Sequence, residues 1–509
     1  MTRRLGDLLA GIDTTTQRGD MGLPVSGIAY DSRRVEPGFL FVAIRGTKQD
    51  GGQFVKDALS RGAIAVVADV PLPRIHDAAV IEVADSRKAL AHLAANYYDH
   101  PARELRLVGI TGTNGKTTTS LLIESILRSA GHSVGVLGTL AYRWAGTVRK
   151  APMTTPESLD LQCLFTDMRK VGVTHVVMEV SSHALALGRV EGCGFDACVF
   201  TNLSQDHLDF HASMEEYFNA KSRLFTEYVR CDERGKGIAV VNADDPYGEH
   251  LIKLLKSDCW SYSIQNRDAA VWVSEAELTP EGIKAILSTP KGPLQLQSRL
   301  IGRLNLYNLV AAATTALALG LDMDEVARGL AAVTSVDGRL EPVPLPPDAG
   351  FSVVVDYAHT PDAMEKALEC LREMTHNRLI VVFGCGGDRD RGKRPLMGKM
   401  AARWGDLVIL TSDNPRGERP EAIVAEIENG VRETGWKRLE SNPSPSDRNG
   451  YVVEVDRRRA IELALECARR GDIVFIGGKG HETYQIVGTQ VVPFDDRIVV
   501  RDTMARKGS

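Results

Sequence analysis

The segment from Leu105 to Thr119, LRLVGITGTNGKTTT, constrains the fold of this chain more than any other. Its first half is an apolar run rich in β-branched residues, which predicts a buried strand. A loop with Gly112 and Gly115 follows, and Lys116 then opens a helical pattern that ends at Gly131. A strand, a glycine-rich loop and a helix in this order cradle phosphate groups, because loop amides and the positive end of the helix dipole point at the anion. The segment therefore predicts a nucleotide-binding site in an α/β domain.

This phosphate loop departs from the ordinary pattern at one position. The usual spacing would require glycine where the chain has Ile110, so the loop is a variant. Lys116 is expected to reach the terminal phosphates, and the Thr117 hydroxyl to ligate Mg²⁺. A surface turn is the alternative interpretation, but the strand, the Lys-Thr pair and the helix together favour a nucleotide. The residues expected around ATP are Gly112, Thr113, Asn114, Gly115, Lys116, Thr117 and Thr118.

Apolar runs and turns divide the chain into three predicted α/β domains. Residues 1–100 contain short apolar runs among turns and predict a small domain that ends at a His100-Pro101 linker. Over residues 101–337, apolar runs alternate with helical patterns, which predicts a mainly parallel, P-loop-type sheet covered on both faces. Residues 338–509 repeat this alternation and predict a Rossmann-like domain, without the glycine spacing that NAD requires. Functional residues are then expected at the carboxyl ends of the strands.

Composition excludes several classes of protein. The chain has 61 Lys and Arg against 66 Asp and Glu and no basic run, so nucleic acid is not a predicted partner. Its 8 cysteines are dispersed, which indicates buried thiols rather than a zinc site or a disulfide framework. No apolar run is long enough for a signal peptide or a membrane span, so we expect a cytoplasmic protein that does not enter the membrane.

Polar residues after the central strands are candidates for chemistry. Glu179 ends an apolar run, where an ionised carboxylate is costly unless it is paired or metal-bound, so it is expected to hold Mg²⁺ near Thr117. A solvent-facing carboxylate is the alternative. His207 follows the next strand and could ligate a metal or orient a phosphate, although a lone loop histidine is more often a surface residue. Lys221 lies in an amphipathic helix and, from its pattern alone, is expected to be an exposed cation.

Four charged clusters follow strands of the last predicted domain. Runs of charge usually form solvated faces, but four at strand ends predict a shared cleft. Arginine binds carboxylates through two parallel hydrogen bonds and acidic residues bind ammonium groups, so the cleft suits a zwitterionic substrate. The clusters are Asp356–Asp362, Gly386–Arg394, Asp413–Arg416 and Gly478–Glu482.

Taken together, these residues resemble the Mur ligases, the ATP-dependent amino-acid-adding enzymes of peptidoglycan synthesis. The resemblance implies three domains that bind, in chain order, the UDP-linked substrate, ATP and the amino acid, and it implies a part in cell wall formation, cell shape and cell division. The matching stretches run in one order along nearly the whole chain: Gly112–Thr118, Glu179–His183, Thr201–Asp209, Tyr217–Phe225, Gly302–Asn308, Gly338–Glu341 and Asp356–Asp362.

The resemblance also implies roles for individual residues. The implied catalytic residues are Lys116, Glu179, His207, Lys221 and His359. Lys221 matches a carbamylated lysine, an anion able to bind Mg²⁺, and the implied metal ligands are Thr117, Glu179, His207 and Lys221. Three further residues match positions associated with ATP: Asn305, Arg339 and Asp356. Contacts to the UDP-linked substrate are implied for Tyr30, Ser32, Thr47, Lys48, Gln49, Thr154, Thr155, Ser181, Leu187 and Arg189.

The run Asp413–Arg416 resembles the signature of family members that add meso-diaminopimelate. Diaminopimelate has a second carboxylate that lysine lacks, and Arg416 can clamp it. The implied activity is ATP-dependent addition of meso-diaminopimelate to UDP-N-acetylmuramoyl-L-alanyl-D-glutamate through an acyl phosphate, by a monomer with Mg²⁺. The implied diaminopimelate contacts are Arg389, Asp413, Asn414, Pro415, Arg416, Gly478 and Glu482.

Three departures and two alternatives remain. Met153, Leu187 and Leu304 stand where the family often has Asn, Gln and Phe, and the first two put individual contacts to the UDP-linked substrate in question. One alternative is another ligase with the same ATP site, such as a folylpolyglutamate synthetase, against which Asp413–Arg416 argues. The other is a nucleotide-binding regulatory protein that has lost the ligase cleft, against which the intact set of implied catalytic residues argues.

Overall fold

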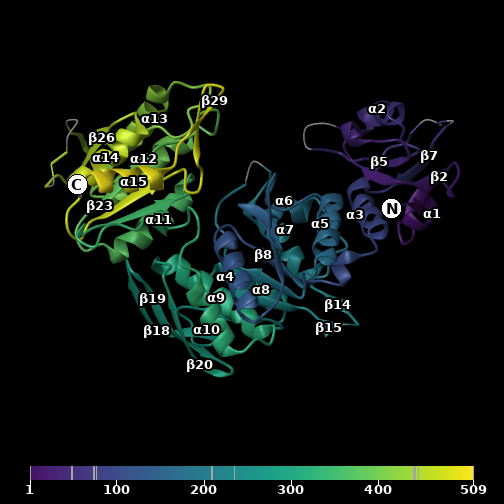
Figure 1. The fold of residues 1–509 in the computed structure, drawn as a ribbon, viewed down its shortest axis with the longest axis horizontal. Coiled ribbons are helices and arrows are strands. Elements are labelled where there is room, and N and C mark those ends of the chain that lie inside the picture. Colours follow the sequence, from purple (N-terminus) through teal and green to yellow (C-terminus); the bar gives the residue numbers. More distant parts are fainter. Residues whose placement is uncertain are drawn as a thin grey trace. The chain divides into compact units, whose positions relative to one another are not determined.

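The computed structural model describes residues 2–46, 50–72, 75, 77–207, 210–233, 235–439, 443–444 and 446–507. The chain divides into two compact units: unit 1 comprises Met1–Tyr262 and Ala311–Val326, and unit 2 comprises Ser263–Val310 and Ala327–Ser509. Both units combine helices with sheets (Figure 1), which confirms the predicted α/β class. The sequence predicts three domains, and the boundaries at 100/101 and 337/338 stay predictions.

Unit 1 begins with a five-stranded sheet in the order β2-β7-β6-β5-β4. Strands β4 to β7 pair in parallel and β2 joins antiparallel. Alternate residues of β5 face opposite sides, so Leu40 and Val42 pack with α1 and α3 while Phe41 packs with α2. The bounds are β1 Arg3–Arg4, α1 Leu5–Leu8, β2 Thr14–Arg18, β3 Pro24–Val25, β4 Gly27–Ala29, η1 Ser32–Arg34, β5 Phe39–Ala43, η2 Gly51–Phe54, α2 Val55–Ser60, β6 Ala65–Ala68, β7 Ala79–Val83, α3 Ser86–Tyr97 and η3 Pro101–Arg103.

The second sheet of unit 1 carries the phosphate loop. Its strands lie in the order β11-β10-β9-β12-β8-β13-β16-β17, and all neighbours from β9 to β17 pair in parallel. The prediction of a mainly parallel sheet is therefore correct. The bounds are β8 Arg106–Thr111, α4 Lys116–Ser129, β9 Val134–Leu137, β10 Ala141–Trp144, β11 Thr147–Lys150, α5 Ser158–Lys170, β12 His175–Glu179, α6 Ser182–Ala186, β13 Ala197–Phe200, α7 Met214–Thr226, β14 Cys231–Asp232, β15 Gly235–Lys236, β16 Ile238–Asn242, α8 Pro246–Leu254 and β17 Trp260–Ser263.

Parallel pairing determines where the polar residues of this sheet gather. The carboxyl ends of parallel strands meet at one edge, so Thr111, Glu179 and Phe200 end neighbouring strands there. Apolar side chains of α5, α6 and α7 form one core with β12 and β13. The phosphate loop, Glu179 and the segment from Thr201 are thereby held at the same edge of the sheet.

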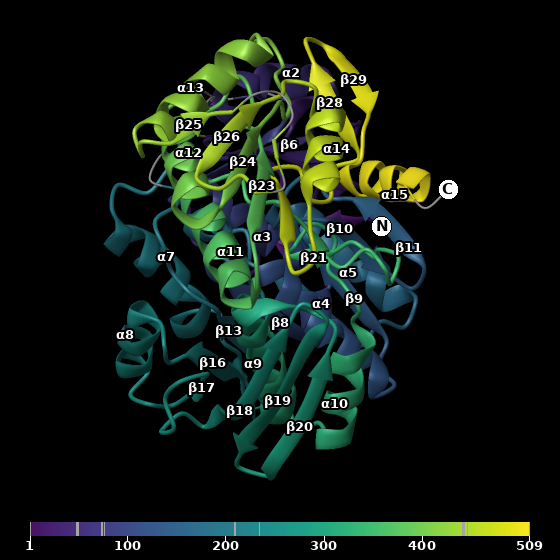
Figure 2. The ribbon, with the colours of Figure 1, turned by 90° about the vertical axis from the view of Figure 1, so that its left-hand side faces the viewer.

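Unit 2 opens with an antiparallel meander that the sequence analysis does not predict, and it continues with a seven-stranded sheet. The seven strands lie in the order β21-β22-β27-β23-β24-β26-β25 and are parallel except for β21. Helices α11, α12 and α13 pack on one face of the sheet and α14 and α15 on the other (Figure 2), as a Rossmann-like arrangement requires.

The elements of this part of the chain have the following bounds: β18 Val271–Thr279, β19 Gly282–Thr289, β20 Gly292–Ser298, α9 Gly302–Ala318, α10 Met323–Ala332, β21 Glu341–Pro342, β22 Ser352–Asp356, α11 Pro361–Met374, β23 Leu379–Phe383, α12 Lys393–Trp404, β24 Leu407–Leu410, α13 Pro420–Arg432, β25 Lys437–Arg438, β26 Gly450–Val453, α14 Arg457–Cys467, β27 Ile473–Gly477, β28 Tyr484–Val487, β29 Gln490–Pro493 and α15 Asp496–Lys507. Among the described helices, none combines the length and apolar character needed to span a bilayer.

Candidate active site

The phosphate loop is shaped by two glycines and by the segment that follows β13. Gly112 has φ +145°, and a Cβ there would lie 1.9 Å from Thr201 Oγ1, so only glycine fits. Gly115 has φ +87° and directly precedes α4. The amides of Thr113 and Asn114 donate to Asn202, to its backbone oxygen and its Oδ1 respectively, each at 2.9 Å. The loop and the Thr201–Asn202 segment therefore form one rigid piece at the carboxyl edge of the sheet.

Two lysine amines meet at this loop. Lys116 Nζ donates to Gly112 O at 2.8 Å, and Lys221 Nζ donates to the same oxygen at 2.9 Å. Burial, with a further contribution from the charge on Lys116, lowers the pKa of Lys221 well below its usual value. The expectation of an exposed Lys221 is wrong, because the side chain is 1% exposed. Lys221 thus lies beside the phosphate loop, and its implied roles as carbamylated residue and metal ligand stay predictions.

Glu179 is a buried carboxylate held by hydroxyl and amide donors. It is 1% exposed and accepts from Thr117 Oγ1, Thr139 N and Thr139 Oγ1, each at 3.0 Å. Glu179 and Thr117 are thus together, as expected for two magnesium ligands, and hydroxyl and carboxylate oxygens are ligands that Mg²⁺ prefers. Thr139 was not predicted from the sequence, although a hydroxyl two residues after the strand Val134–Leu137 is the signal that could have found it.

Aromatic side chains connect His207 with the Lys221 amine. The His207 ring centroid lies 4.9 Å from that of His183 and 6.0 Å from that of Tyr217. Lys221 Nζ lies 4.5 Å from the Tyr217 ring, and the Tyr217 hydroxyl lies 3.3 Å from Thr113 Oγ1. Across the described residues, no group of three or more His, Cys, Asp or Glu could hold a metal by itself. A magnesium ion here would therefore depend on hydroxyl, carbamate, phosphate or water oxygens as well.

Four of the ten residues implied for the UDP-linked substrate gather beside Glu179. Thr155 Oγ1 donates to the Glu179 backbone oxygen at 2.9 Å and accepts from Ser181 N at 3.1 Å. Arg189 donates to the backbone oxygen of Thr155 at 3.2 Å. The Thr154 and Thr139 hydroxyls lie 3.1 Å apart. Thr154, Thr155, Ser181 and Arg189 thus form one polar patch that reaches the predicted metal ligands.

Three other residues implied for this substrate are described: Tyr30, Ser32 and Leu187. The Tyr30 hydroxyl donates to Asp160 at 2.5 Å, and burial followed by this hydrogen bond raises the pKa of Tyr30. Ser32 is buried in η1, and Leu187 is the half-buried residue that directly follows α6. Thr47, Lys48 and Gln49 lie outside the described residues.

Glu157, a buried carboxylate that was not predicted as a site residue, links two arginines at this patch. Glu157 is 6% exposed, and its two oxygens lie 3.2 Å from Arg87 and 3.1 Å from Arg189. Arg87 also donates to the Arg45 backbone oxygen. Two arginines on one carboxylate leave one positive charge in excess, which suits an anionic substrate.

In unit 2, two of the implied nucleotide residues, Arg339 and Asp356, and the implied catalytic residue His359 surround Tyr357 or adjoin it. The Asp356 carboxylate accepts from the amides of Leu340 and Ala358, both at 2.7 Å, and burial raises its pKa while Arg339 opposes that rise. The Arg339 guanidinium lies 5.1 Å from the Tyr357 ring, and the His359 ring lies 4.6 Å from it. Asn305, on α9, donates to the Ile301 oxygen at 2.9 Å.

The implied diaminopimelate residues also converge in unit 2. Asn414 Nδ2 donates to Glu482 Oε2 at 2.8 Å. A Cβ built on Gly386 would lie 2.9 Å from Arg416 Nη1 and 3.7 Å from Arg389 Cγ, so both arginines lie at that glycine.

The backbone brings the remaining members of this set close. A Cβ on Gly478 would lie 3.7 Å from Asp413 Oδ2, and one on Gly387 would lie 1.8 Å from the Pro415 oxygen. Arg416 has φ +51°, a left-handed conformation that is rare for a residue with a side chain. Two arginines and three acidic or amide side chains thus share the loops after β23, β24 and β27, as the predicted zwitterion cleft requires.

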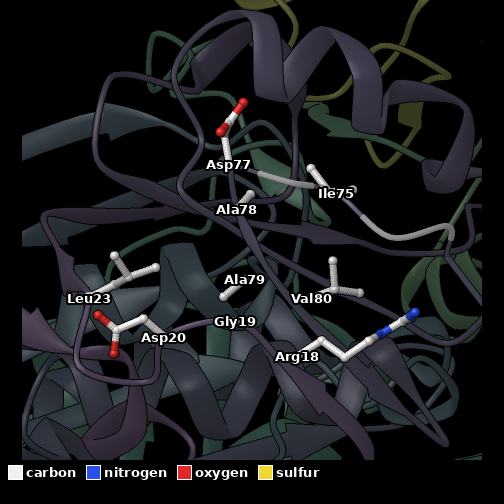
Figure 3. A pocket seen from close by; sticks show the side chains of 9 residues that line it. All are labelled: Arg18, Gly19, Asp20, Leu23, Ile75, Asp77, Ala78, Ala79 and Val80. Atoms are coloured by element: carbon white, nitrogen blue, oxygen red, sulfur yellow. The ribbon is translucent and has the colours of Figure 1, made fainter.

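A separate hollow of 650 Å³ lies in the first part of unit 1 (Figure 3). It is lined by residues of β2, of the turn after β2, of the segment before β7 and of β7 itself, with Arg18, Asp20 and Asp77 as its charged side chains. Its lining includes none of the residues implied for ATP, metal or substrates. The hollow therefore adds nothing to the candidate site.

Comparisons with known proteins cover almost the whole chain. Three family models match it: "Mur ligase family, catalytic domain" over residues 24–98, "Mur ligase middle domain" over 110–316, and "Mur ligase, glutamate ligase domain" over 338–480. A UDP-N-acetylmuramoyl-L-alanyl-D-glutamate–2,6-diaminopimelate ligase of Geobacter metallireducens is 46% identical over 497 residues, which cover 97% of each chain. The protein of that name from Gloeobacter violaceus is 47% identical over 509 residues, covering 99% of each. A solved structure of a ligase with the same name has a TM-score of 0.72 and 32% identity and covers 100% of both chains. These matches confirm the resemblance predicted from the motifs.

Proposed function

The chain belongs to the Mur ligase family, and from this premise we propose that it adds meso-diaminopimelate to UDP-N-acetylmuramoyl-L-alanyl-D-glutamate with conversion of ATP to ADP and phosphate. The observation that carries the choice of amino acid is the placement of Arg416 and Arg389 at Gly386, in the same loops as Asn414 and Glu482. Paired arginines suit the carboxylates of diaminopimelate, and the acidic side suits an ammonium group. Two relatives that match this chain over nearly their full length are named as diaminopimelate-adding ligases, and they support the same choice.

The proposed reaction has two chemical steps. A γ-carboxylate oxygen of the substrate glutamate attacks the terminal phosphorus of ATP, and ADP leaves, which gives an acyl phosphate. The amine of diaminopimelate then attacks the acyl carbon, a C–N bond forms, the amine loses a proton, and phosphate leaves. A free carboxylate is a poor electrophile, so the first step provides the leaving group that the second needs.

The residues of the phosphate loop would stabilise the charge that moves in both steps. Lys116 stands at the first position of α4, where its ammonium adds to the positive end of the helix dipole. The Thr117 hydroxyl and the Glu179 carboxylate provide oxygen ligands that fit Mg²⁺. Bound Mg²⁺ would neutralise phosphate charge, with His207 and carbamylated Lys221 as the further proposed ligands.

The buried position of Lys221 supports its carbamylation. Only a neutral amine attacks carbon dioxide: an N–C bond forms and a proton is released. Burial and the neighbouring Lys116 favour that neutral form. A carbamate at Lys221 would turn repulsion between two cations into attraction, since the new anion would lie beside the Lys116 ammonium.

The polar patch beside Glu179 would orient the UDP-linked substrate. Thr154, Thr155 and Ser181 provide hydroxyls within the hydrogen-bond network that contains Glu179. Arg189 and Arg87 share Glu157, which leaves a positive charge for the anionic substrate. By forming this amide bond the enzyme would supply peptidoglycan precursors in the cytoplasm, as a monomer, and so support cell shape and division.

One assay tests the proposed function. ADP release is measured with the UDP-linked dipeptide alone, with diaminopimelate alone, with both together, and with lysine in place of diaminopimelate. We expect release only when both substrates are present, and far less with lysine. Release with a folate and glutamate would instead indicate the related synthetase, and no release under any of these conditions would indicate a binding protein.

A further inference from the structure

Lys479 is a buried cation that lies among the residues proposed to bind diaminopimelate but is not itself one of them. It follows β27 and lies between Gly478, with φ +107°, and Gly480, with φ +52°. A Cβ on Gly480 would lie 2.7 Å from Tyr357 Cβ, so this turn packs tightly. The Lys479 side chain is 0% exposed, whereas lysines are almost never fully buried unless they are paired.

The Lys479 ammonium has three partners, which match its three donors. Nζ lies 3.4 Å from Asp413 Oδ1, 3.2 Å from Asn414 Oδ1 and 3.1 Å from Glu482 Oε2. Its partners come from two separate loops, one after β24 and one after β27. One buried group therefore joins the two loops that carry most of the proposed amino-acid contacts.

Lys479 fixes the orientation of the Asn414 amide. Asn414 Oδ1 accepts from Lys479 Nζ and, at 2.9 Å, from Ile486 N. The Nδ2 group must then face Glu482, where it donates to Oε2. Without the lysine, one of the two donors that hold Oδ1 is lost and the amide is freer to turn.

The same contacts leave one oxygen of Glu482 available. Lys479 Nζ and Asn414 Nδ2 both donate to Oε2. Among the described residues, none donates a hydrogen bond to Oε1. Glu482 therefore presents Oε1 in a fixed direction, and an ammonium group is the natural partner for a carboxylate oxygen held in this way.

The charges beneath these loops point to the same ligand. Arg457 is fully buried, forms an ion pair with the equally buried Asp496 at 2.7 Å, and donates to the Gly477 oxygen. Lys479 and Arg457 together face the three carboxylates of Asp413, Glu482 and Asp496. Among these five groups one negative charge remains in excess, which a substrate ammonium can neutralise, whereas Arg389 and Arg416 at Gly386 suit the substrate carboxylates.

We propose that Lys479 is a positioning residue for the amino-acid substrate: it clamps the two loops, orients Asn414, and commits one oxygen of Glu482 so that the other receives the substrate ammonium. This inference rests on the proposed function, because it assumes that these loops bind diaminopimelate. Lys479 does not touch the reacting atoms, so its removal affects the binding of the amino acid more than the chemical steps.

The test is steady-state kinetics of Lys479→Met, a neutral side chain of similar length. We expect the KM for diaminopimelate to rise about 10- to 100-fold, as for the loss of a buried charge-assisted hydrogen bond. The KM values for ATP and the UDP-linked dipeptide should stay within about twofold of those of the unaltered enzyme, because only amino-acid contacts change.

Arg378→Met is the matched control. Arg378 is 1% exposed and pairs with Asp472, but both residues precede their strands, at the edge of the same sheet opposite to Lys479. Both variants should unfold at a lower temperature, since each removes a buried cation from its partner. Only Lys479→Met should raise the KM for diaminopimelate.

The outcomes separate this inference from the proposed function. If the unaltered enzyme releases ADP without diaminopimelate, the proposed function fails and Lys479 loses its assigned substrate. If the unaltered enzyme requires diaminopimelate and Lys479→Met keeps the same KM for it, or raises all three KM values alike, the positioning role is overturned. If Lys479→Met does not fold, Lys479→Arg decides, because it keeps the charge but cannot place donors at the same three points. A raised KM for diaminopimelate alone then supports the role, and an unchanged one overturns it.

Discussion

At the scale of single residues, the unusual feature is that two lysine amines donate to the same carbonyl oxygen, that of Gly112. Like charges repel, and the repulsion between Lys116 and Lys221 at Gly112 is not screened by water, because Lys221 is buried. The pair becomes stable when Lys221 loses its proton or becomes a carbamate. Loss of the proton favours carbamylation, because only the neutral amine attacks carbon dioxide. The burial of Lys221 therefore favours the carbamate that the proposed reaction uses.

The first prediction concerns Lys221→Ala. We expect kcat to fall about a hundredfold, since one electrostatic contact to the reacting phosphates is lost. Added short-chain carboxylic acids should restore part of the activity, because a small carboxylate can occupy the space of the carbamate. ADP release measures both effects. Lys236→Ala, which alters a lysine whose side chain is 60% exposed, is the control. Full activity without Lys221 would exclude the carbamate role.

The second prediction concerns Arg416→Lys. Lysine keeps the positive charge but lacks the planar fork that binds a carboxylate through two hydrogen bonds. The preference for diaminopimelate over lysine, measured as the ratio of kcat/KM values, should fall about tenfold or more. Arg419→Lys is the control, because Arg419 lies near the same loop with a side chain that is 84% exposed. An unchanged preference in Arg416→Lys would contradict the clamp.

Burial of charged side chains is what sequence reasoning handled least well at this scale. Lys221 lies four residues after Tyr217 and three before Leu224, so it belongs to the apolar stripe of α7, and that spacing could have corrected the expectation of an exposed cation. Lys479 gave a weaker signal, a lysine between two glycines after a buried strand. Glu157 gave none, because its partners Arg87 and Arg189 are distant in the sequence and only the fold brings them together.

At the scale of elements, a small hairpin holds the residue proposed to select the amino acid. Strands β28 and β29 pair antiparallel, and β28 lies beside the loop after β24. Arg416 N donates to the Ile486 oxygen at 3.0 Å, and Gly488 N donates to the Arg416 oxygen at 2.8 Å. These two hydrogen bonds hold Arg416 in its left-handed conformation, so the hairpin determines where its guanidinium lies.

The third prediction tests the hairpin with Gly488→Ala. Gly488 has φ +60° and no atom within 4 Å of an added Cβ, so the substitution strains the turn, by about 1 kcal/mol, without a clash. Loosening of the hairpin should raise the KM for diaminopimelate severalfold and leave the KM for ATP unchanged. Gly435→Ala is the control, with φ +83° and equally open surroundings at a turn after α13. A KM for diaminopimelate that rises equally in both variants would show that the hairpin has no special role.

Buried parallel strands could be predicted and the antiparallel meander was missed, for one physical reason. A strand covered on both faces reads as a continuous apolar run, such as Leu379–Phe383. Strands β19 and β20 bury only alternate residues, so their signal is diluted by polar ones. A usable signal lay in the turns: Thr279-Pro280-Glu281-Gly282 and Thr289-Pro290-Lys291-Gly292 repeat one pattern, and each threonine hydroxyl donates to the glycine oxygen.

At the scale of the whole molecule, the parallel sheet of unit 1 has the candidate site at one edge and a half-buried histidine that affects stability at the other. The candidate site occupies the carboxyl edge of the parallel strands, whereas His175 begins β12 at the opposite edge. The ring centroids of His175 and His132 lie 4.2 Å apart. Burial, followed by the charges of His132 and Arg106, lowers the pKa of His175 from 6.5 to about 4. Protonation at this edge therefore disfavours the folded state without involving the site.

The fourth prediction is that unit 1 loses stability in mild acid because of His175. Above pH 6.5 neither the folded nor the unfolded chain protonates this side chain, and below about pH 4 both do. Between these values only the unfolded chain binds the proton, so the free energy of unfolding should decrease as the pH falls through this window. Urea unfolding at several pH values measures the slope, and His175→Gln should make it shallower by removing the titrating group. His376→Gln, an alteration in unit 2, should leave the slope of unit 1 as it is. An unchanged slope in His175→Gln would mean that acid acts on the buried carboxylates of the sheet instead.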